Sequence, residues 1–295
     1  MASGMPRSAQ SPGSVSIRLV TLNVRYATKK PVPGEAPWSI RSPKLCAQLK
    51  FITSGHSSAF VCLQEVLYSQ LVDVQARLGP SWGYIGLGRD DGQRAGEFSP
   101  IFFRVDEWVC QRNKTYWLSK TPDVPSVGWD AALKRVCTVG SFRHKKTGTD
   151  LVIMSTHFDH RGETAREESA KLLIQLARTW AGHSGQAAQI PLFLGGDFNS
   201  TPDGRAYKAL TSTNSPMQDM SKLLSDDLKY GNQDITYTSF GEADEEPKRI
   251  DFLFAWEPSG LSISGFGILS NRFDDQVYLS DHRPVVADVE IPLEV

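Results

Sequence analysis

The chain has 295 residues, of which 40% are hydrophobic and 22% charged, and its formal net charge at pH 7 is −1. This length and composition are ordinary for one large α/β domain that buries a sizeable core. The near-neutral charge argues against a protein that holds long nucleic acid by charge alone, because such proteins usually present a basic face. No stretch approaches the roughly 20 apolar residues that span a bilayer.

Residues 1 to 16 are rich in Ser, Gly and Pro and contain no apolar run. We therefore expect a disordered N-terminal tail over 1–16, rather than a signal peptide, followed by a single domain over 17–295. The expected location is intracellular, in the cytoplasm, unless an export signal has been removed. Because the cysteines are widely spaced and lack a paired C-x-x-C, buried free thiols are expected at Cys46, Cys62, Cys110 and Cys137.

Apolar periodicity predicts strands and helices that alternate along the chain. In chain order, strands are expected at 16–24, 59–66, 98–105 and 116–119. A helix between the first two is predicted to start at an N-cap on Ser42, with Pro43 in its first turn, and to end near Gly55. Next come a hairpin over 138–158, with its turn at Lys145, Lys146 and Gly148, and a helix over 164–180. The later strands are expected at 191–198, 249–256 and 283–291.

Polar residues interrupt these apolar strands close to the strand ends. They are Asn23, Glu65, His157, Asp197, Asn199, Asp251, Asp281 and His282. Any one alone is explained as a cap or turn residue, and Asp251 alone as an anchor for Arg249. In α/β proteins, however, ligands bind where strand ends and their loops converge. Together these residues predict a polar site at that edge.

Six short motifs occur in an order typical of one enzyme superfamily. They are LNVR (22–25), LQE (63–65), STHFDH (155–160), GGDFN (195–199), RID (249–251) and SDHRP (280–284). In this order they resemble the endonuclease/exonuclease/phosphatase superfamily over about residues 17–291. Stretches such as GEFSPIFFR (96–104) look more like its metal-dependent hydrolase branch of bacteria and fungi. The resemblance implies an α/β fold of the deoxyribonuclease kind, a four-layer sandwich in which two mixed β-sheets pack face to face with helices outside.

The resemblance also implies a metal site. Hydrolysis of a phosphate ester needs charge neutralised on the phosphoryl oxygens, a positioned water and help for the leaving oxygen. Mg²⁺ prefers oxygen ligands and keeps several waters, so that one or two carboxylates suffice. By the resemblance, Glu65 is the main ligand of Mg²⁺ or Mn²⁺, and Asn23 and Asp281 complete or orient its shell.

Asp197 and Asn199 are expected to handle the attacking water. Asp197 would act as its base or orient it, and Asn199 would hold the same water or a phosphate oxygen. We expect both side chains to face the same way, because they are two residues apart on an extended strand, and Phe198 to face the core. The two glycines before them are expected to let backbone and substrate approach closely.

Two histidines are expected to contact the scissile phosphate. His282 resembles the family's phosphate-contacting histidine, and Asp251 is expected to fix its tautomer and favour its charged form. His157 is the second, with an ordinary core histidine as the alternative interpretation. The remaining histidines fall in predicted turns or loops and receive no role: His56, His144, His160 and His183.

Substrate-binding residues are predicted from position alone. Arg25 and Tyr116 are candidates for contacting a phosphate. Tryptophans near predicted loops are candidates for lining a pocket: Trp38, Trp117 and Trp129. If the acidic loop at 241–247 overhangs the site, it repels a polyanionic strand and favours a small or neutral-tailed substrate.

The predicted function is hydrolysis of a small phosphomonoester or phosphodiester, derived from a sugar, an inositol or a lipid, by direct attack of water. A nuclease, deadenylase-like or repair-like, is the alternative, because the same residues serve both reactions; nucleic acid is therefore an open but less favoured partner. A non-catalytic binding module that keeps the fold is a third interpretation. The presence of every expected catalytic residue type argues against it.

Overall fold

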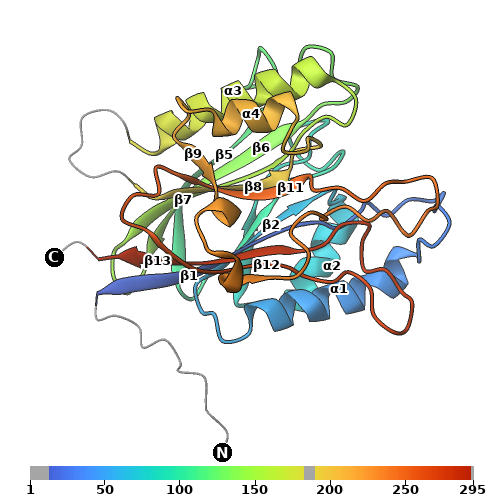
Figure 1. Cartoon of the computed structure of the whole chain (residues 1–295), viewed down its shortest axis with the longest axis horizontal. Coiled ribbons are helices and arrows are strands. Elements are labelled where there is room, and N and C mark those ends of the chain that lie inside the picture. The colour runs from blue at the N-terminus through green and yellow to red at the C-terminus, as the bar shows by residue number, and fades with distance from the viewer. Residues whose placement is uncertain (1–12, 183–189, 294–295) are drawn as a thin grey trace, which may run out of the picture.

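Two β-sheets lie between two pairs of helices in the computed structural model, which describes residues 13–182 and 190–293 (Figure 1). The helices are α1 (Trp38–Thr53), α2 (Tyr68–Leu78), α3 (Glu163–Trp180) and α4 (Arg205–Thr211), with short 3₁₀ helices η1 (Met220–Lys222) and η2 (Asp226–Leu228). In Figure 1, α3 and α4 cover the sheets from above and α1 and α2 from below. The expected four-layer α/β sandwich is confirmed.

Both sheets are mixed. The seven-stranded sheet has the order β10 (Lys229–Tyr230), β12 (Ser262–Ile268), β13 (Val285–Pro292), β1 (Ser14–Asn23), β2 (Ala59–Gln64), β4 (Ile101–Arg104) and β3 (Trp82–Ile85). The six-stranded sheet has the order β5 (Trp108–Trp117), β6 (Val136–His144), β7 (Asp150–His157), β8 (Leu192–Asp197), β11 (Asp251–Trp256) and β9 (Met217–Asp219). The predicted hairpin over 138–158 is confirmed as β6 and β7.

Three apolar clusters hold the layers together. The cluster between the two sheets includes Phe60, the cluster beneath α1 and α2 includes Leu49 and Val74, and the cluster beneath α3 and α4 includes Leu173 and Phe198. Strands such as β2 and β8 are buried on both faces, which explains why their sequences are almost continuously apolar. The polar residues of such strands are therefore confined to their ends.

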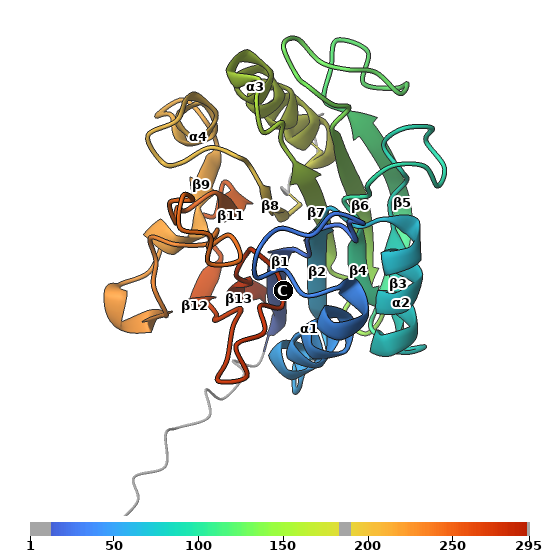
Figure 2. The same cartoon turned by 90° about the vertical axis from the view of Figure 1, so that its right-hand side faces the viewer.

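Each sheet has a parallel pair of strands at its centre, and the two pairs end at the same edge of the molecule. β1 and β2 are joined through α1, and β7 and β8 through α3. Figure 2 shows these four strands next to one another at the centre of the fold. In register, Asn23 pairs with Gln64, and His157 pairs with Asp197. Polar residues far apart in the sequence are thereby placed in one group.

The glycines of β8 allow close packing of the strands and sheets around them. A side chain on Gly195 would press against Thr21 and Leu253, and one on Gly196 would overlap the backbone oxygen of Thr156 on β7. The expected close approach of neighbouring backbone is confirmed at Gly196, and the expected approach of substrate stays a prediction.

Helix α1 begins at Trp38 rather than after the predicted cap at Ser42, so that Pro43 lies inside the helix. Arg41 in the first turn is fully buried and donates hydrogen bonds to backbone carbonyls that follow β1 and precede β13. These tertiary contacts extend the helix towards its N-terminus. A local signal at Ser42 cannot show them.

Several boundaries also differ from the predictions. Residues 1–12 of the expected tail, and His183, lie outside the described residues, while Ser14 already pairs with Pro292 on β13. Strand β5 is longer than predicted. Its middle residues are exposed and polar, so the apolar pattern of the sequence does not mark them as part of a strand. The elements that were not predicted are α2, α4, β3, β9, β10 and β12.

All four cysteines are free, three of them buried and Cys110 partly exposed. In the described part of the chain, no helix combines the length and apolar character that crossing a membrane requires.

Candidate active site

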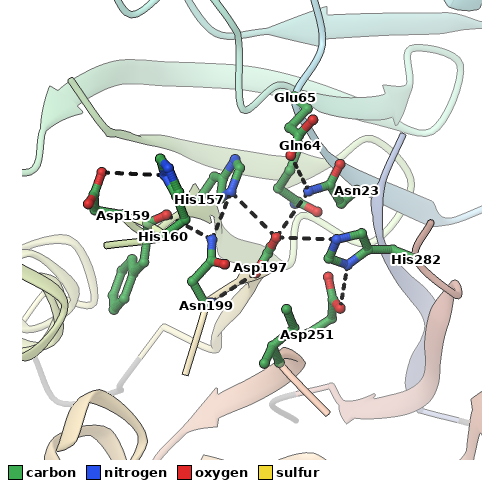
Figure 3. A network of polar contacts seen from close by, with 12 residues as sticks. Asn23, Gln64, Glu65, His157, Asp159, His160, Asp197, Asn199, Asp251 and His282 are labelled. Atoms are coloured by element: carbon green, nitrogen blue, oxygen red, sulfur yellow. Dashed lines mark hydrogen bonds and ion pairs between the residues drawn. The ribbon is translucent and has the colours of Figure 1, made fainter. Parts of the chain in front are cut away.

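Figure 3 shows most of the polar residues predicted from the strand ends around the Asp197 carboxylate: Asn23, Glu65, His157, Asn199, Asp251 and His282. Asn23 Nδ2 donates to Asp197 Oδ2 at 3.0 Å, and His157 Nε2 and His282 Nε2 lie 3.4 and 3.7 Å from the same oxygen. Asp197 is only 1% exposed. Burial, together with repulsion by Asp251, raises the pKa of Asp197 to about 7. A carboxyl group with this pKa is suited to accept a proton near neutral pH.

Asn199 is held beside Asp197 by a turn. Strand β8 ends at Asp197, and Asn199 has a left-handed backbone with φ of 46°. Its N–H donates to Asp197 Oδ1 at 2.9 Å. The two residues therefore do not share a face of an extended strand, and that expectation is wrong, although both lie against His157. Phe198 is fully buried in the core, as expected.

His282 and Asp251 form a buried pair. His282 Nδ1 lies 2.8 Å from Asp251 Oδ2, which fixes the proton on Nδ1 and leaves Nε2 facing Asp197. Burial opposes the charged form of His282, but the charges of Asp251 and Asp197 outweigh it and raise the pKa of His282 to about 10. An imidazole that is cationic at neutral pH is suited to bind a phosphoryl oxygen or to give a proton to a leaving group.

Glu65, Asn23 and Asp281 form an oxygen-rich group beside Asp197. Asn23 Nδ2 also donates to Glu65 Oε1 at 3.0 Å, and the Tyr26 N–H donates to Glu65 Oε2 at 3.1 Å. These bonds hold Glu65 in a left-handed conformation with φ of 59°, which is uncommon for a residue other than glycine. Burial raises the pKa of Asp281 to about 6, with His282 opposing the shift and the Glu65 charge adding to it. Carboxylates that repel each other in this way fit a divalent cation.

A second group of possible ligands consists of Asp197, Asp251 and His282, whose nearest ligand atoms lie within 4.8 Å of one another. In this group His282 Nδ1 is already engaged with Asp251, and ligation of a metal by an imidazole requires a deprotonated ring nitrogen. The group around Glu65, in contrast, offers carboxylate and amide oxygens, which hard cations prefer.

His157 is positioned by Arg135, a residue that the sequence analysis did not identify. Arg135 Nη1 lies 3.0 Å from His157 Nδ1, and because a guanidinium only donates, Nδ1 accepts and the proton lies on Nε2. Two groups lie close to the Nε2 proton, Asn199 Nδ2 and Asp197 Oδ2. Asn199 Nδ2 is itself a donor, which donates to the Phe158 carbonyl at 3.1 Å. Asp197 is therefore the acceptor for the Nε2 proton. Burial and the charge of Arg135 hold the pKa of His157 well below its usual value.

Arg135 also anchors the loop before β6. Its Nε donates to Asp159 Oδ1 at 3.4 Å, and its Nη2 lies 3.0 Å from His160 Nδ1. Asp159 further accepts backbone N–H groups of Ala132 and Gly162. Asp159 lies inside the STHFDH motif, which was the available signal for it, whereas Arg135 lies in a loop without a pattern of its own.

Of the predicted substrate residues, Arg25 lies nearest the site but is paired. Its Nε lies 3.3 Å from Glu35 Oε1, and its backbone N–H donates to Asn23 Oδ1. Tyr116 lies elsewhere: its ring packs on the core beneath α3, and its hydroxyl accepts a hydrogen bond from Trp180 Nε1 at the far end of that helix. Tyr116 is therefore removed from the substrate site.

The predicted tryptophans differ in their surroundings. Trp129 is half-buried, has a φ of 45° and lies in the loop that Asp159 holds. Trp117 is buried and donates to the Arg89 carbonyl, and Trp38 donates to Asp73. Only Trp129 stays a candidate for contacting substrate.

The acidic loop at 241–247 approaches the site through Tyr237. The Tyr237 ring packs edge-on against His282, with ring centroids 5.1 Å apart, and its hydroxyl donates to Glu245 at 3.4 Å. The acidic loop therefore lies on the His282 side of the site.

The chain is similar in sequence or in fold to several known proteins. No protein-family model matches the sequence. An uncharacterized protein of Acanthamoeba polyphaga mimivirus is 27% identical over 193 residues, 63% of this chain and 68% of that protein. The endonuclease/exonuclease/phosphatase from Bacteroides vulgatus is 33% identical, with a TM-score of 0.81, over 94% of this chain and 99% of that one. The mannosyl-6-phosphatase of Bacteroides thetaiotaomicron is 30% identical, with a TM-score of 0.81, over 92% and 99%.

These similarities extend over nearly the whole chain and include the strands that carry the site. Together with the two mixed sheets and the polar group at their shared edge, they establish that the chain belongs to the endonuclease/exonuclease/phosphatase family, whose members hydrolyse phosphate esters.

Proposed function

We propose that this protein hydrolyses a small phosphate ester by direct attack of water, with a divalent cation, and that its described residues from 14 onward act as one catalytic domain. The observation that carries the proposal is the convergence on Asp197 Oδ2. Asn23, His157 and His282 approach this one oxygen from three strand ends. The group thus combines one proton acceptor, Asp197, with two neutral donors, Asn23 and His157, and one cationic donor, His282.

The geometry supports a distinct role for each side chain. Asp197, with a pKa near 7, accepts the proton of the attacking water, and Asn199 helps to hold that water or a phosphate oxygen. His157 offers its Nε2 proton to a phosphoryl oxygen. His282, protonated and oriented by Asp251, stabilises the charge that develops on the phosphate and supplies a proton to the leaving oxygen.

Glu65 would hold the cation, with Asn23 and Asp281 completing or orienting the site. Mg²⁺ or Mn²⁺ bound there would neutralise charge on the phosphoryl oxygens. The donor set consists of carboxylate and amide oxygens, which hard cations prefer.

The proposed substrate class is a small phosphomonoester, with sugar phosphates first. The 30% identical relative is a mannosyl-6-phosphatase, which supports this class. The acidic loop beside Tyr237 supports it as well, because carboxylates close to His282 disfavour a long polyanion that passes over them.

The test is one panel of substrates measured with Mg²⁺, with Mn²⁺ and with chelator: mannose 6-phosphate, a generic phosphodiester, single-stranded DNA, duplex DNA and RNA. We expect Mg²⁺- or Mn²⁺-dependent release of phosphate from the sugar phosphate. His282→Ala should lower the rate by about 10²-fold or more, the range for a positioned acid–base group. His56→Ala is the matched control, because His56 lies beside Arg18 and Asp288, before the start of β2 and so at the end of that strand opposite to Glu65.

Turnover that persists in chelator, or that is the same in His282→Ala and wild type, would contradict the mechanism. Cleavage of the oligonucleotides instead of the sugar phosphate, with a steep dependence on salt, would replace the proposed function by a nuclease.

A further inference from the structure

A pocket of about 290 Å³ opens beside Asn199, between the N-terminal ends of α3 and α4. Its walls include His160, Glu163, Arg166, Arg205 and Lys248. This volume is at the lower end of the range for small-molecule sites, which is about 300 to 1,000 Å³. We refer to these residues, together with Asn199, as the basic pocket.

The basic pocket concentrates positive charge in a chain whose formal net charge is −1. Arg166 comes from α3, Arg205 from α4, and Lys248 from the segment before β11. Glu163 is the one acidic residue among its walls, so the lining carries a formal charge of +2. Three cations brought from separate elements into one small concavity indicate a site for an anion.

Two cations of the basic pocket, Arg205 and Lys248, are weakly engaged, whereas Arg166 Nη1 donates to the Asp159 carbonyl at 3.0 Å. Arg205 is 61% exposed and lies 3.4 Å from Glu163, an exposed pair of the kind that contributes little. Lys248 Nζ lies over the Tyr237 ring, 5.2 Å from its centroid. His160 Nδ1 accepts from Arg135, so in the neutral ring the proton lies on Nε2, which adds a donor. The two weakly engaged cations can turn towards an incoming anion at little cost.

The basic pocket adjoins the reacting groups directly. Asn199 lines it and lies 3.0 Å from His157 Nε2, and Ile250, which precedes Asp251, forms part of its floor. A molecule whose phosphate lies against His157 and His282 therefore extends into this pocket with its non-reacting part.

We propose that the basic pocket binds a second phosphate of the substrate, and that the enzyme acts on small molecules that carry two phosphates, such as a sugar bisphosphate. The inference rests on the proposed function and makes its substrate class more specific. A polynucleotide fits less well, because a strand long enough to pass both sides of the site meets the acidic loop near Tyr237. A small bisphosphate needs to span only the reacting groups and the basic pocket.

The test compares kcat/KM for fructose 6-phosphate, fructose 1-phosphate and fructose 1,6-bisphosphate with the full chain and Mg²⁺. We expect kcat/KM for the bisphosphate to exceed that for either monophosphate by about tenfold or more, mainly through a lower KM. The second phosphate would make charge-assisted hydrogen bonds in the basic pocket, and such bonds are roughly twice as strong as neutral ones. Binding of fructose 1,6-bisphosphate in EDTA, measured by titration calorimetry, gives a readout that needs no turnover.

The variant is Arg205→Gln with Lys248→Gln. The matched control is Arg178→Gln with Lys208→Gln, which removes the same charge from exposed positions on α3 and α4 outside the pocket. The pocket variant should lose the preference and the calorimetric binding while it keeps its rate on the monophosphates. The control should retain both.

Equal kcat/KM values for mono- and bisphosphates in wild type, or a preference that survives in the pocket variant, would overturn the inference and leave the proposed function intact. Pocket-dependent binding without hydrolysis of any sugar phosphate would overturn the proposed function instead. A gain on a short oligonucleotide that depends on Arg205 and Lys248, without a gain on the bisphosphate, would assign the pocket to nucleic acid.

Discussion

At the scale of single residues, the site depends on the different pKa values of Asp197 and His282. Both groups are buried, and burial alone would neutralise both. Burial, together with the charge of Asp251, raises the pKa of Asp197 to about 7, whereas the charges of Asp251 and Asp197 outweigh burial at His282 and raise its pKa to about 10. Between these values the site holds a carboxylate acceptor and an imidazolium donor together. Activity should therefore rise through pH 7 and fall towards pH 10.

Asp251→Asn should shift the alkaline limb of the pH–rate profile to lower pH. The amide no longer stabilises the charged ring, so His282 loses its proton closer to its ordinary value of 6.5. We expect kcat/KM at neutral pH to fall by about 10²-fold, as for other electrostatic groups of active sites. The measurement is kcat/KM from pH 5 to 10.5. An unchanged alkaline limb would show that Asp251 does not set the charge of His282.

Arg135 should act as a positioning residue for His157. Arg135→Lys keeps the charge but cannot serve His157, Asp159 and His160 at once. We expect kcat to fall by about tenfold or more with a smaller change in KM, since misplacement of a donor affects mainly the transition state. Arg143→Lys is the control, because Arg143 is exposed and pairs with Asp150 on the hairpin. Equal loss of kcat in both variants would contradict the role.

At this scale the sequence predicted which residue types meet, because strand ends and ordered motifs are visible in it. It did not predict how they meet. Asp197 and Asn199 come together through a turn, since the strand ends at Asp197 and Asn199 itself has a left-handed backbone. Arg135 has no local signal, because its three partners lie more than 20 residues further along the chain, on the segment 157–160. Tyr116 has the right chemistry, but its side chain faces the helix layer.

At the scale of elements, the site depends on two parallel strand pairs whose carboxyl ends coincide. Long, periodic elements such as α3 and the hairpin over β6 and β7 were predictable from the sequence. The edge strand β5 and the start of α1 were not predictable. The exposed polar residues of β5 break its apolar pattern, and the start of α1 depends on tertiary hydrogen bonds of the buried Arg41. In the central pairs, β2 and β8 were found because burial on both faces makes them almost continuously apolar, and β1 was found from the alternation of its buried residues.

Gly196→Ala should disturb the pairing of β7 with β8. The added methyl group would overlap the Thr156 backbone oxygen, which cannot move without separating the strands. We expect a loss of about 1 to 3 kcal/mol in the free energy of unfolding, the usual cost of overpacking, and a fall in kcat because His157 and Asp197 end these strands. Gly265→Ala on β12 is the control, because its nearest neighbour is at ordinary contact distance. Equal stability of the two variants in urea would contradict the packing role.

At the scale of the whole molecule, acidic and basic side chains gather in different places around the site, which the net charge does not show. The carboxylates of Glu65 and Asp281 lie at the edge of the seven-stranded sheet, and the basic pocket lies beyond Asn199 between α3 and α4. A near-neutral total of −1 conceals both. Composition could therefore exclude a broad basic face, but it could not reveal a local one.

Binding of Mg²⁺ or Mn²⁺ should stabilise the whole fold. An acid whose folded pKa is raised, such as Asp281 at about 6, costs stability as pH rises from its unfolded value through that range, and a cation at Glu65 and Asp281 removes this cost. A ligand at 100 times its Kd adds about 2.7 kcal/mol, and each kcal/mol raises the Tm of a large domain by about 2 to 4 °C. We expect a rise of about 5 to 10 °C over chelator at pH 8 and a smaller one at pH 5, where protons compete with the cation. Glu65→Gln should lose the rise, while Glu107→Gln, which removes a carboxylate that pairs with His144 on the hairpin, should keep it. Calorimetric melting reports this shift without any substrate, and a full shift in Glu65→Gln would place the cation elsewhere.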